Sequence, residues 1–290
     1  MTANLPEEFD PIDRGFARVA EGLVHYRSTP GNEARPPLVL LHASPGSSRG
    51  LIPLMRALHA EPDAPRVIAP DTPGNGDTFA PAVEDPDITW FVDALVRTLD
   101  ALGIEKADIY GAHTGARTAC EAAAARPDRF RTVIFDGIGD YSPEMRQLLL
   151  EKYAPPMQPD DYGQQLIWAF HFVRDQALHF PHFLRDPEHR LMTRPVPDAD
   201  DLHERTLEVL KALRSYHKPY RAAFAYESRK RMPDISIPAL MLCAANELPN
   251  LRAAAAEMAA LMPRSELVPV SAAFPEKAKA ILSFLERHSQ

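Results

Sequence analysis

Short apolar runs recur along this chain, and segments with helical periodicity separate them. Residues 38–41 and 133–135 are continuously apolar, which is typical of parallel strands buried on both faces of a sheet. Phe91, Leu95 and Leu99 have the spacing of one face of a helix. Strands that alternate with helices predict right-handed crossovers. We therefore predict an α/β fold: a mostly parallel sheet of about eight strands with helices on both faces.

The strand pattern stops after about residue 139 and resumes at about residue 233. Between these points, residues 140–232 are rich in Pro, His and aromatic side chains, with helical stretches but no run typical of a buried strand. We therefore predict a core made of residues 1–139 and 233–290, and a helical cap, residues 140–232, inserted into it.

One segment of the predicted cap, residues 164–176, has the pattern of an amphipathic helix. Its apolar face would consist of Leu166, Ala169, Phe170 and Val173. An adjoining face would carry Trp168, His171 and Arg174. Two interpretations stay open: these three residues lie in solvent beside a packing helix, or they line a substrate pocket. Residues 211–231 predict a mostly charged surface helix.

The composition is typical of an ordinary globular protein and argues against several kinds of partner and site. Hydrophobic residues make up 45% of the 290 residues and charged residues 25%, as in ordinary globular proteins. The net charge of −8 argues against nucleic acid or an anionic membrane as a partner. The 2 cysteines favour neither a disulfide framework nor a zinc motif. No membrane-length apolar run and no signal-peptide pattern is evident, so we expect a cytoplasmic protein; assembly as a homodimer stays open.

A Gly-x-His-x-Gly sequence follows the apolar pair at residues 109–110 and precedes an alanine-rich helical segment. Gly111 and Gly115 are small enough for a strand and a helix to pack closely through a sharp turn. This segment resembles the nucleophile elbow of the α/β-hydrolase superfamily. Further motifs resemble that superfamily in the same order, over nearly the whole chain but least in the cap: LLHASPGSS from residue 40, APDTPGNGDT from residue 69, IPALMLCAANE from residue 237 and LERH from residue 285.

The resemblance implies a catalytic triad, and the chain departs from it at two of its positions. The family's elbow residue is Ser, Cys or Asp, whereas here it is His113. The family's acid aligns near Glu247, while the position of its general-base histidine falls at Ala272 and Ala273. His288 lies too far along the chain to replace that base. Acyl transfer by a Ser-His-Asp triad needs all three roles, so we do not expect an ordinary serine esterase.

His113 has two interpretations. Histidine side chains ordinarily titrate near pH 6.5, which suits proton transfer at neutral pH, so His113 would act as a general base or a nucleophile. It would then need an orienting carboxylate, for which Asp136, Asp140 and Glu247 are candidates; Asp136 and Glu247 complete our predicted catalytic set. In the alternative, His113 merely fills the elbow of an inactive enzyme.

The family's oxyanion hole implies two backbone donors, which map to the amides of Ser44 and Thr114. Ser44 is also a candidate for a displaced nucleophile. His42 has a catalytic interpretation and a structural one, in which it bridges loops by hydrogen bonding. A His42/His113 metal pair lacks support, and the histidines of residues 171–182 match no ligand spacing, so we predict no metal.

These residues predict a cofactor-independent enzyme that acts on a small organic molecule by hydrolysis or by cleavage of a C–C or C–O bond. Arg174 would clamp a substrate carboxylate, so an anionic substrate is expected. One alternative is a lyase or a cofactor-free oxygenase of the same fold, in which His113 deprotonates the substrate. Another is a non-catalytic relative that binds a ligand or a protein.

Overall fold

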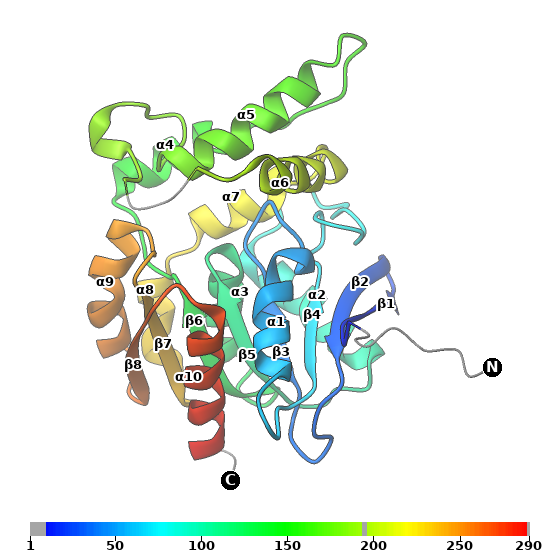
Figure 1. The fold of residues 1–290 in the computed structure, drawn as a ribbon, viewed down its shortest axis with the longest axis vertical. Coiled ribbons are helices and arrows are strands. Elements are labelled where there is room, and N and C mark those ends of the chain that lie inside the picture. Colours follow the sequence, from blue (N-terminus) through cyan, green and yellow to red (C-terminus); the bar gives the residue numbers. More distant parts are fainter. Residues whose placement is uncertain (1–9, 193–195, 289–290) are drawn as a thin grey trace, which may run out of the picture.

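One eight-stranded sheet forms the centre of the protein (Figure 1). The computed structural model describes residues 10–192 and 196–288. The strands are β1 (Asp13–Val19), β2 (Gly22–Thr29), β3 (Leu38–Leu41), β4 (Val67–Pro70), β5 (Ala107–Ala112), β6 (Phe130–Asp136), β7 (Ala239–Ala244) and β8 (Ser265–Val270). Their order is β1-β2-β4-β3-β5-β6-β7-β8, with β2 antiparallel to β1 and β4 and the other neighbours parallel. The predicted mostly parallel sheet of about eight strands is confirmed.

Helices connect most of the strands and cover both faces of the sheet (Figure 1). The α-helices are α1 (Ile52–His59), α2 (Ile88–Ala101), α3 (Thr114–Ala125), α4 (Pro143–Lys152), α5 (Gln164–Leu178), α6 (Ala199–Lys211), α7 (His217–Ala225), α8 (Ser228–Arg231), α9 (Pro249–Ala260) and α10 (Phe274–Arg287). Short 3-10 helices are η1 (Ser48–Leu51), η2 (Pro187–His189) and η3 (Met232–Asp234). None of the helices in the described parts of the chain is long and apolar enough to cross a membrane.

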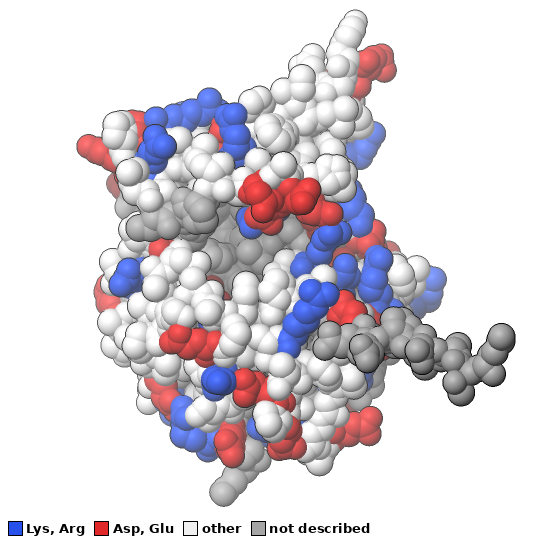
Figure 2. Space-filling model, viewed as in Figure 1, with Lys and Arg blue, Asp and Glu red and all other residues white. Residues whose placement is uncertain are grey.

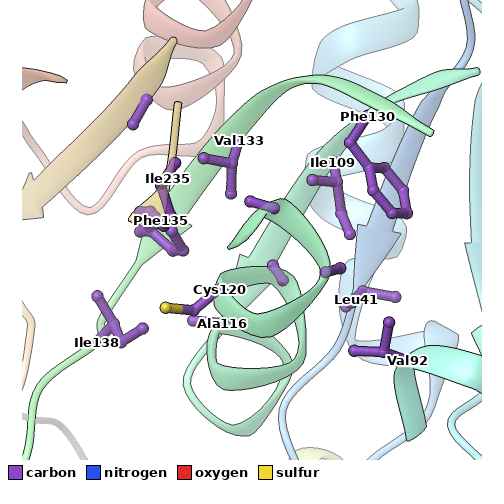
Figure 3. Packing of buried hydrophobic residues seen from close by; sticks show 14 of the residues in the cluster. Leu41, Val92, Ile109, Ala116, Cys120, Phe130, Val133, Phe135, Ile138 and Ile235 are labelled. Atoms are coloured by element: carbon purple, nitrogen blue, oxygen red, sulfur yellow. The ribbon is translucent and has the colours of Figure 1, made fainter. Parts of the chain in front are cut away.

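Successive side chains of each strand point to opposite faces, and the two faces enclose separate hydrophobic clusters. On one face, α2, α3 and α9 pack against residues such as Ile109 and Val133. On the other, α1 and α10 pack against residues such as Tyr110 and Ile134. Figure 3 shows Ala116 of α3 beside these strands. The elbow helix is thus held between the sheet and its flanking helices.

The chain between β6 and β7 forms a helical layer, defined here as α4 to α7, above the rest of the molecule (Figure 1). It then continues into α8, which lies lower and contacts α3 (Figure 1). The layer's own aromatic cluster includes Tyr153, Phe172, Tyr216 and Tyr220. The prediction that residues 211–231 form a mostly charged surface helix is wrong, because α7 packs against α2 and α3 and most of its side chains are buried. The division of the chain at residues 139/140 and 232/233 into two units stays a prediction.

Helix α5 has the predicted periodicity, but its buried face differs from the predicted one. Ala169 and Val173 are buried as expected, together with Phe172. Leu166 and Phe170, predicted on the same face, are 53% and 40% exposed. The reason is that α5 packs mainly on α6, so the position of that neighbour decides which apolar residues are covered.

Candidate active site

A strained turn between β5 and α3 holds His113. Its backbone has φ 50° and ψ −106°, and a positive φ is uncommon for a non-glycine residue. The flanking glycines permit the turn, because an added Cβ would lie 2.5 Å from the Gly115 carbonyl oxygen at Gly111, and 2.5 Å from the Leu41 carbonyl oxygen at Gly115. The sequence therefore folds into the predicted strand-turn-helix arrangement, and the imidazole, 34% exposed, projects at the start of α3.

Glu247 lies beside this imidazole. Its Oε2 is 3.5 Å from Nε2 of His113, and its side chain is only 6% exposed. The Leu248 amide donates a hydrogen bond of 2.6 Å to Oε1 of the same carboxylate. Gly137, at φ +82°, faces the pair closely: a Cβ there would lie 2.3 Å from Glu247 Oε2 and 3.3 Å from His113 Cε1. The structure thus brings the predicted His113 and Glu247 together against a glycine backbone.

Asp136 has a different environment from the one expected of an orienting carboxylate. Its Oδ2 accepts hydrogen bonds from the Tyr110 hydroxyl at 2.7 Å and the Lys277 ammonium at 2.5 Å. Burial first, and then the Asp136 charge, raises the pKa of the Tyr110 hydroxyl well above its ordinary value. Toward His113, Asp136 presents its main-chain carbonyl oxygen, which accepts from the His113 amide at 3.2 Å. The expectation that the Asp136 carboxylate orients the imidazole therefore needs correction.

Asp140, the third carboxylate considered as a partner of His113, instead contacts the backbone at the start of α8. Its two carboxylate oxygens accept hydrogen bonds from the amides of Ser228 and Arg229, each at 2.9 Å. It therefore ties the start of α8 to the loop after β6.

His42 joins two loops. Its Nδ1 lies 3.0 Å from the Ala43 carbonyl oxygen, and the Thr72 amide donates to its Nε2 at 2.9 Å. Because a carbonyl only accepts and an amide only donates, Nδ1 of the ring donates and Nε2 accepts. His42 is 2% exposed and both nitrogens are occupied. This geometry matches the loop-bridging interpretation, and it leaves no ring nitrogen for a metal shared with His113.

Ser44 and Thr114, the predicted oxyanion donors, contact each other directly. The Ser44 amide donates to Thr114 Oγ1 at 2.6 Å, and this hydroxyl lies 3.2 Å from Ser44 Oγ as a donor. The loop and the elbow are therefore adjacent, as the resemblance implies. The Ser44 amide, however, already has an acceptor in this arrangement.

Two residues that the sequence did not reveal also contact Ser44. The Tyr220 hydroxyl of α7 donates to the Ser44 carbonyl oxygen at 2.7 Å, and Asn75 Nδ2 lies 3.4 Å from Ser44 Oγ. Asn75 is 1% exposed, and its Oδ1 has no hydrogen-bond partner. Asn75 belongs to the motif that starts at residue 69, which was a usable signal; nothing in the sequence around Tyr220 indicated a contact across the molecule.

The three residues predicted to line a pocket from α5 have other contacts. Trp168 stacks on Phe172, with ring centroids 4.9 Å apart. His171 is exposed. The guanidinium of Arg174 is bound by Asp175, with Nη2 to Oδ1 at 3.0 Å. The structure does not bring these side chains to the elbow, so the interpretation as a packing helix describes α5 better.

One group among the described residues has the composition of a metal site: His25, Asp71 and Asp77, with ligand atoms within 4.8 Å of one another. Its oxygens and nitrogens already have protein partners. Asp71 accepts from the His25 ring at 2.8 Å, and Arg14 donates to the other ring nitrogen of His25 and to Asp77. Burial alone would raise the pKa of Asp71, but these and further hydrogen bonds hold it well below its ordinary range. The arrangement is a structural hydrogen-bond network rather than an open coordination site.

One face of the molecule carries charges of both signs around a recess (Figure 2). Figure 2 shows a recess between the lower body of the molecule and the helical layer, with acidic side chains on its upper rim and basic side chains beside it. Two ion pairs lie between the helical layer and the elements below it: Arg49 binds Glu204 at 2.6 Å, and Lys211 binds Asp77 at 2.7 Å. These ion pairs join the helical layer to the loops around the sheet.

The chain is similar to known proteins in sequence and in fold. The sequence profile of the alpha/beta hydrolase fold family matches residues 36–274. Proline iminopeptidase from Xylella fastidiosa is 30% identical over 132 residues, which cover 45% of this chain and 41% of that protein. The chain therefore spans about two fifths of the length of the curated relatives that it matches.

Two solved structures illustrate the likeness in fold. An epoxide hydrolase from Mycobacterium thermoresistibile superposes with a TM-score of 0.69 at 23% identity, covering 94% of this chain and 98% of that one. An enol-lactonase from Burkholderia xenovorans superposes with a TM-score of 0.68 at 20% identity, covering 94% of this chain and 100% of that one. At these identities the likeness is one of fold.

Proposed function

Because this chain belongs to the alpha/beta hydrolase fold family, we propose that it is a cofactor-independent enzyme whose reaction is carried by His113 and Glu247. The observation behind the proposal is their geometry: a partly exposed imidazole 3.5 Å from a buried carboxylate at the elbow. The substrate would be a small organic molecule, and the reaction hydrolysis or cleavage of a C–C or C–O bond.

The chemistry follows from the two ring nitrogens. When Nε2 faces Glu247 and carries the proton, Nδ1 keeps a lone pair that can take a proton from water or from the substrate. The carboxylate then stabilises the imidazolium that forms, as the acid does in a hydrolase triad. The separation of 3.5 Å is longer than an ordinary hydrogen bond, and contacts of this kind commonly tighten when substrate binds.

The sequence supports a role for His113 as the base itself. The positions after β8 at which the family places its base are Ala272 and Ala273, so a second imidazole is missing from that loop. A base located at the elbow would replace both the nucleophile and the distant histidine by one residue. Water, rather than an enzyme hydroxyl, would then attack the substrate.

A screen of substrates tests the proposal. The similar proteins are named as a proline iminopeptidase, an epoxide hydrolase and an enol-lactonase, so a panel of proline amides, epoxides, lactones, esters and thioesters is appropriate. We expect turnover of at least one class, and a loss of about 10²–10⁴-fold in His113→Ala, the range typical of general acid-base catalysis. His203→Ala, at an exposed histidine of α6, is the matched control. Equal turnover by wild type and His113→Ala would contradict the proposal.

A second candidate is a lyase or cofactor-free oxygenase, in which the same imidazole removes a proton from carbon. The missing loop histidine supports this candidate too, because proton abstraction requires a single base. Exchange of a substrate C–H proton with deuterated solvent, without hydrolysis, would favour it. Tight binding of a ligand without turnover or exchange would instead favour a non-catalytic protein.

A further inference from the structure

Every polar group of Ser44 is engaged by another part of the protein. Its amide donates to Thr114 Oγ1 at 2.6 Å, and its Oγ lies within 3.2 Å of the same hydroxyl. Its carbonyl oxygen accepts from Tyr220 at 2.7 Å, and Gln176 donates to the Tyr220 hydroxyl at 3.0 Å. Tyr220 is 4% exposed, so these hydrogen bonds are shielded from water. The loop that would bind a substrate oxygen is thus fixed from both the elbow and the helical layer.

The Thr114 hydroxyl accepts the hydrogen bond of the Ser44 amide, the donor that the family resemblance assigns to a substrate oxygen. Thr114 is the first residue of α3, and the first amides of a helix lack partners within the helix. Such amides carry a partial positive charge and favour an anion. A ligand oxygen that binds here and reaches the Ser44 amide must first displace Thr114 Oγ1. Both Ser44 and Thr114 are partly exposed, so a ligand can approach them.

We propose that Thr114 selects for anionic oxygen at this site by competing with the ligand for the Ser44 amide. This proposal rests on the proposed function, since it assumes that the site binds a reacting oxygen. A neutral carbonyl oxygen gains little by displacing a hydroxyl, because one ordinary hydrogen bond replaces another. An oxyanion forms charge-assisted bonds that are roughly twice as strong, so it displaces the hydroxyl readily.

The site would therefore bind the oxyanion of the transition state in preference to the neutral carbonyl of the bound substrate. The neutral carbonyl of a bound substrate would leave the Thr114–Ser44 bond intact, whereas the oxyanion formed in the transition state would replace it. Interactions made only in the transition state are the ones that accelerate a reaction. Because Tyr220 holds the Ser44 carbonyl, the exchange would occur by rotation of the Thr114 side chain and not by movement of the loop.

The test is ligand binding observed at the Ser44 amide by NMR, with acetate as the anionic probe and acetamide as its neutral counterpart. We expect the amide signal of wild type to respond to acetate and not to acetamide. Thr114→Ala, which removes the competing hydroxyl, should respond to both, and its Ser44 amide should exchange faster with solvent. Thr114→Ser keeps the hydroxyl and should behave as wild type, which controls for the change in side-chain size.

Kinetics provide a second measurement. On an ester or lactone that the wild type turns over, Thr114→Ala should lower KM by about three- to tenfold, the effect of one ordinary hydrogen bond, with little change in kcat. An equal response of wild type to acetamide and acetate would overturn the proposal, as would Thr114→Ser behaving like Thr114→Ala. These binding results decide it even where His113→Ala retains full activity, the outcome that would instead contradict the proposed function.

Discussion

Nε2 of His113 lies 3.5 Å from Oε2 of Glu247, although 134 positions (247 − 113) separate the two residues in the sequence. One residue follows β5 and the other follows β7. The carboxyl ends of parallel strands meet at one edge of an α/β sheet, which is where such folds bind ligands. The pair therefore has the location as well as the chemistry of an acid-base dyad.

Glu247→Gln tests whether the carboxylate charge is required. Gln keeps the size of the side chain but cannot stabilise an imidazolium, so we expect kcat to fall about 10²-fold or more on a substrate identified in the panel. The double variant with His113→Ala should be no slower than His113→Ala alone, because residues that act as a unit are not additive. An additive loss would mean that the two residues act independently.

Gly137 should be intolerant of a side chain. Ala at this position would need a positive φ and would place Cβ 2.3 Å from Glu247 Oε2. The matched control is Gly103→Ala, where φ is +69° but no atom lies within 4 Å of the added Cβ. Positive φ alone costs roughly 1–2 kcal/mol, so Gly103→Ala should lose about that much free energy of unfolding.

For Gly137→Ala we expect a larger loss of stability, together with loss of turnover, because the Glu247 carboxylate must move. Urea unfolding and activity of both variants give the comparison. If Gly137→Ala matched Gly103→Ala in both measurements, the close approach to the His113–Glu247 pair would have no functional importance.

The sequence predicted the sheet and the elbow because both depend on local signals. Continuous apolar runs are enough to predict buried strands, and the small residues around His113 are enough to predict a sharp turn. It left three carboxylates open as partners of His113, since strand ends alone do not tell which way a side chain points. Asp136 ends one buried strand and Glu247 follows another, but only the folded sheet directs one toward Lys277 and the other toward the imidazole.

The positions of the helices in the added layer were harder to predict. Arg174 and Trp168 have the right spacing for one helix face, yet the face of α5 that is covered depends on the position of α6, which the periodicity of α5 does not indicate. The contact of Tyr220 with Ser44 joins residues separated by 176 positions. Periodicity contains no information about such a contact, and the resemblance covers this part of the chain least.

Asp71 should contribute stability that depends on pH. Its carboxylate accepts hydrogen bonds from the His25 ring and from the Ser48 and Asp77 amides, and its pKa lies well below the ordinary value despite burial. A group with a depressed folded-state pKa contributes fully above its unfolded value, about 3.9, and loses the contribution as pH falls toward the folded value.

We therefore expect the free energy of unfolding of wild type to fall steadily below about pH 5. Asp71→Asn should be less stable at pH 7, by about 3–5 kcal/mol, and its stability should vary less between pH 5 and pH 3. Urea titrations at several pH values measure both. If the free energies of unfolding of wild type and Asp71→Asn changed equally with pH, Asp71 would not be the source of the pH dependence.

The two cysteines should differ in reactivity. Burial raises the pKa of the Cys120 thiol to about 12, so little of the reactive thiolate exists at pH 8. Cys243 is partly exposed. A thiol reagent such as Ellman's should modify one thiol of the folded protein, located at Cys243 by peptide mapping, and both after denaturation. Rapid labelling of Cys120 in the folded state would show that α3 opens readily from the sheet.

The carboxylates of Asp136 and Glu247 should have separable roles, and a pair of isosteric variants distinguishes them. Asp136 is buried between Lys277 and Tyr110, and removing one member of a buried ion pair costs about 3–5 kcal/mol, because it leaves the other charge without compensation. Asp136→Asn should therefore lower the free energy of unfolding by about that amount, and Lys277→Met should do the same from the other side of the pair.

Glu247→Gln should differ from Asp136→Asn and Lys277→Met: its free energy of unfolding should change little, and its kcat should fall strongly. The reason is exposure and geometry, since the imidazole that Glu247 faces is still 34% accessible to solvent, and water can solvate it in the variant. Chemical unfolding and single-substrate kinetics of the three variants, measured side by side, give the result. A fall in kcat for Asp136→Asn as large as that for Glu247→Gln, at a temperature where both are folded, would restore Asp136 to the catalytic set.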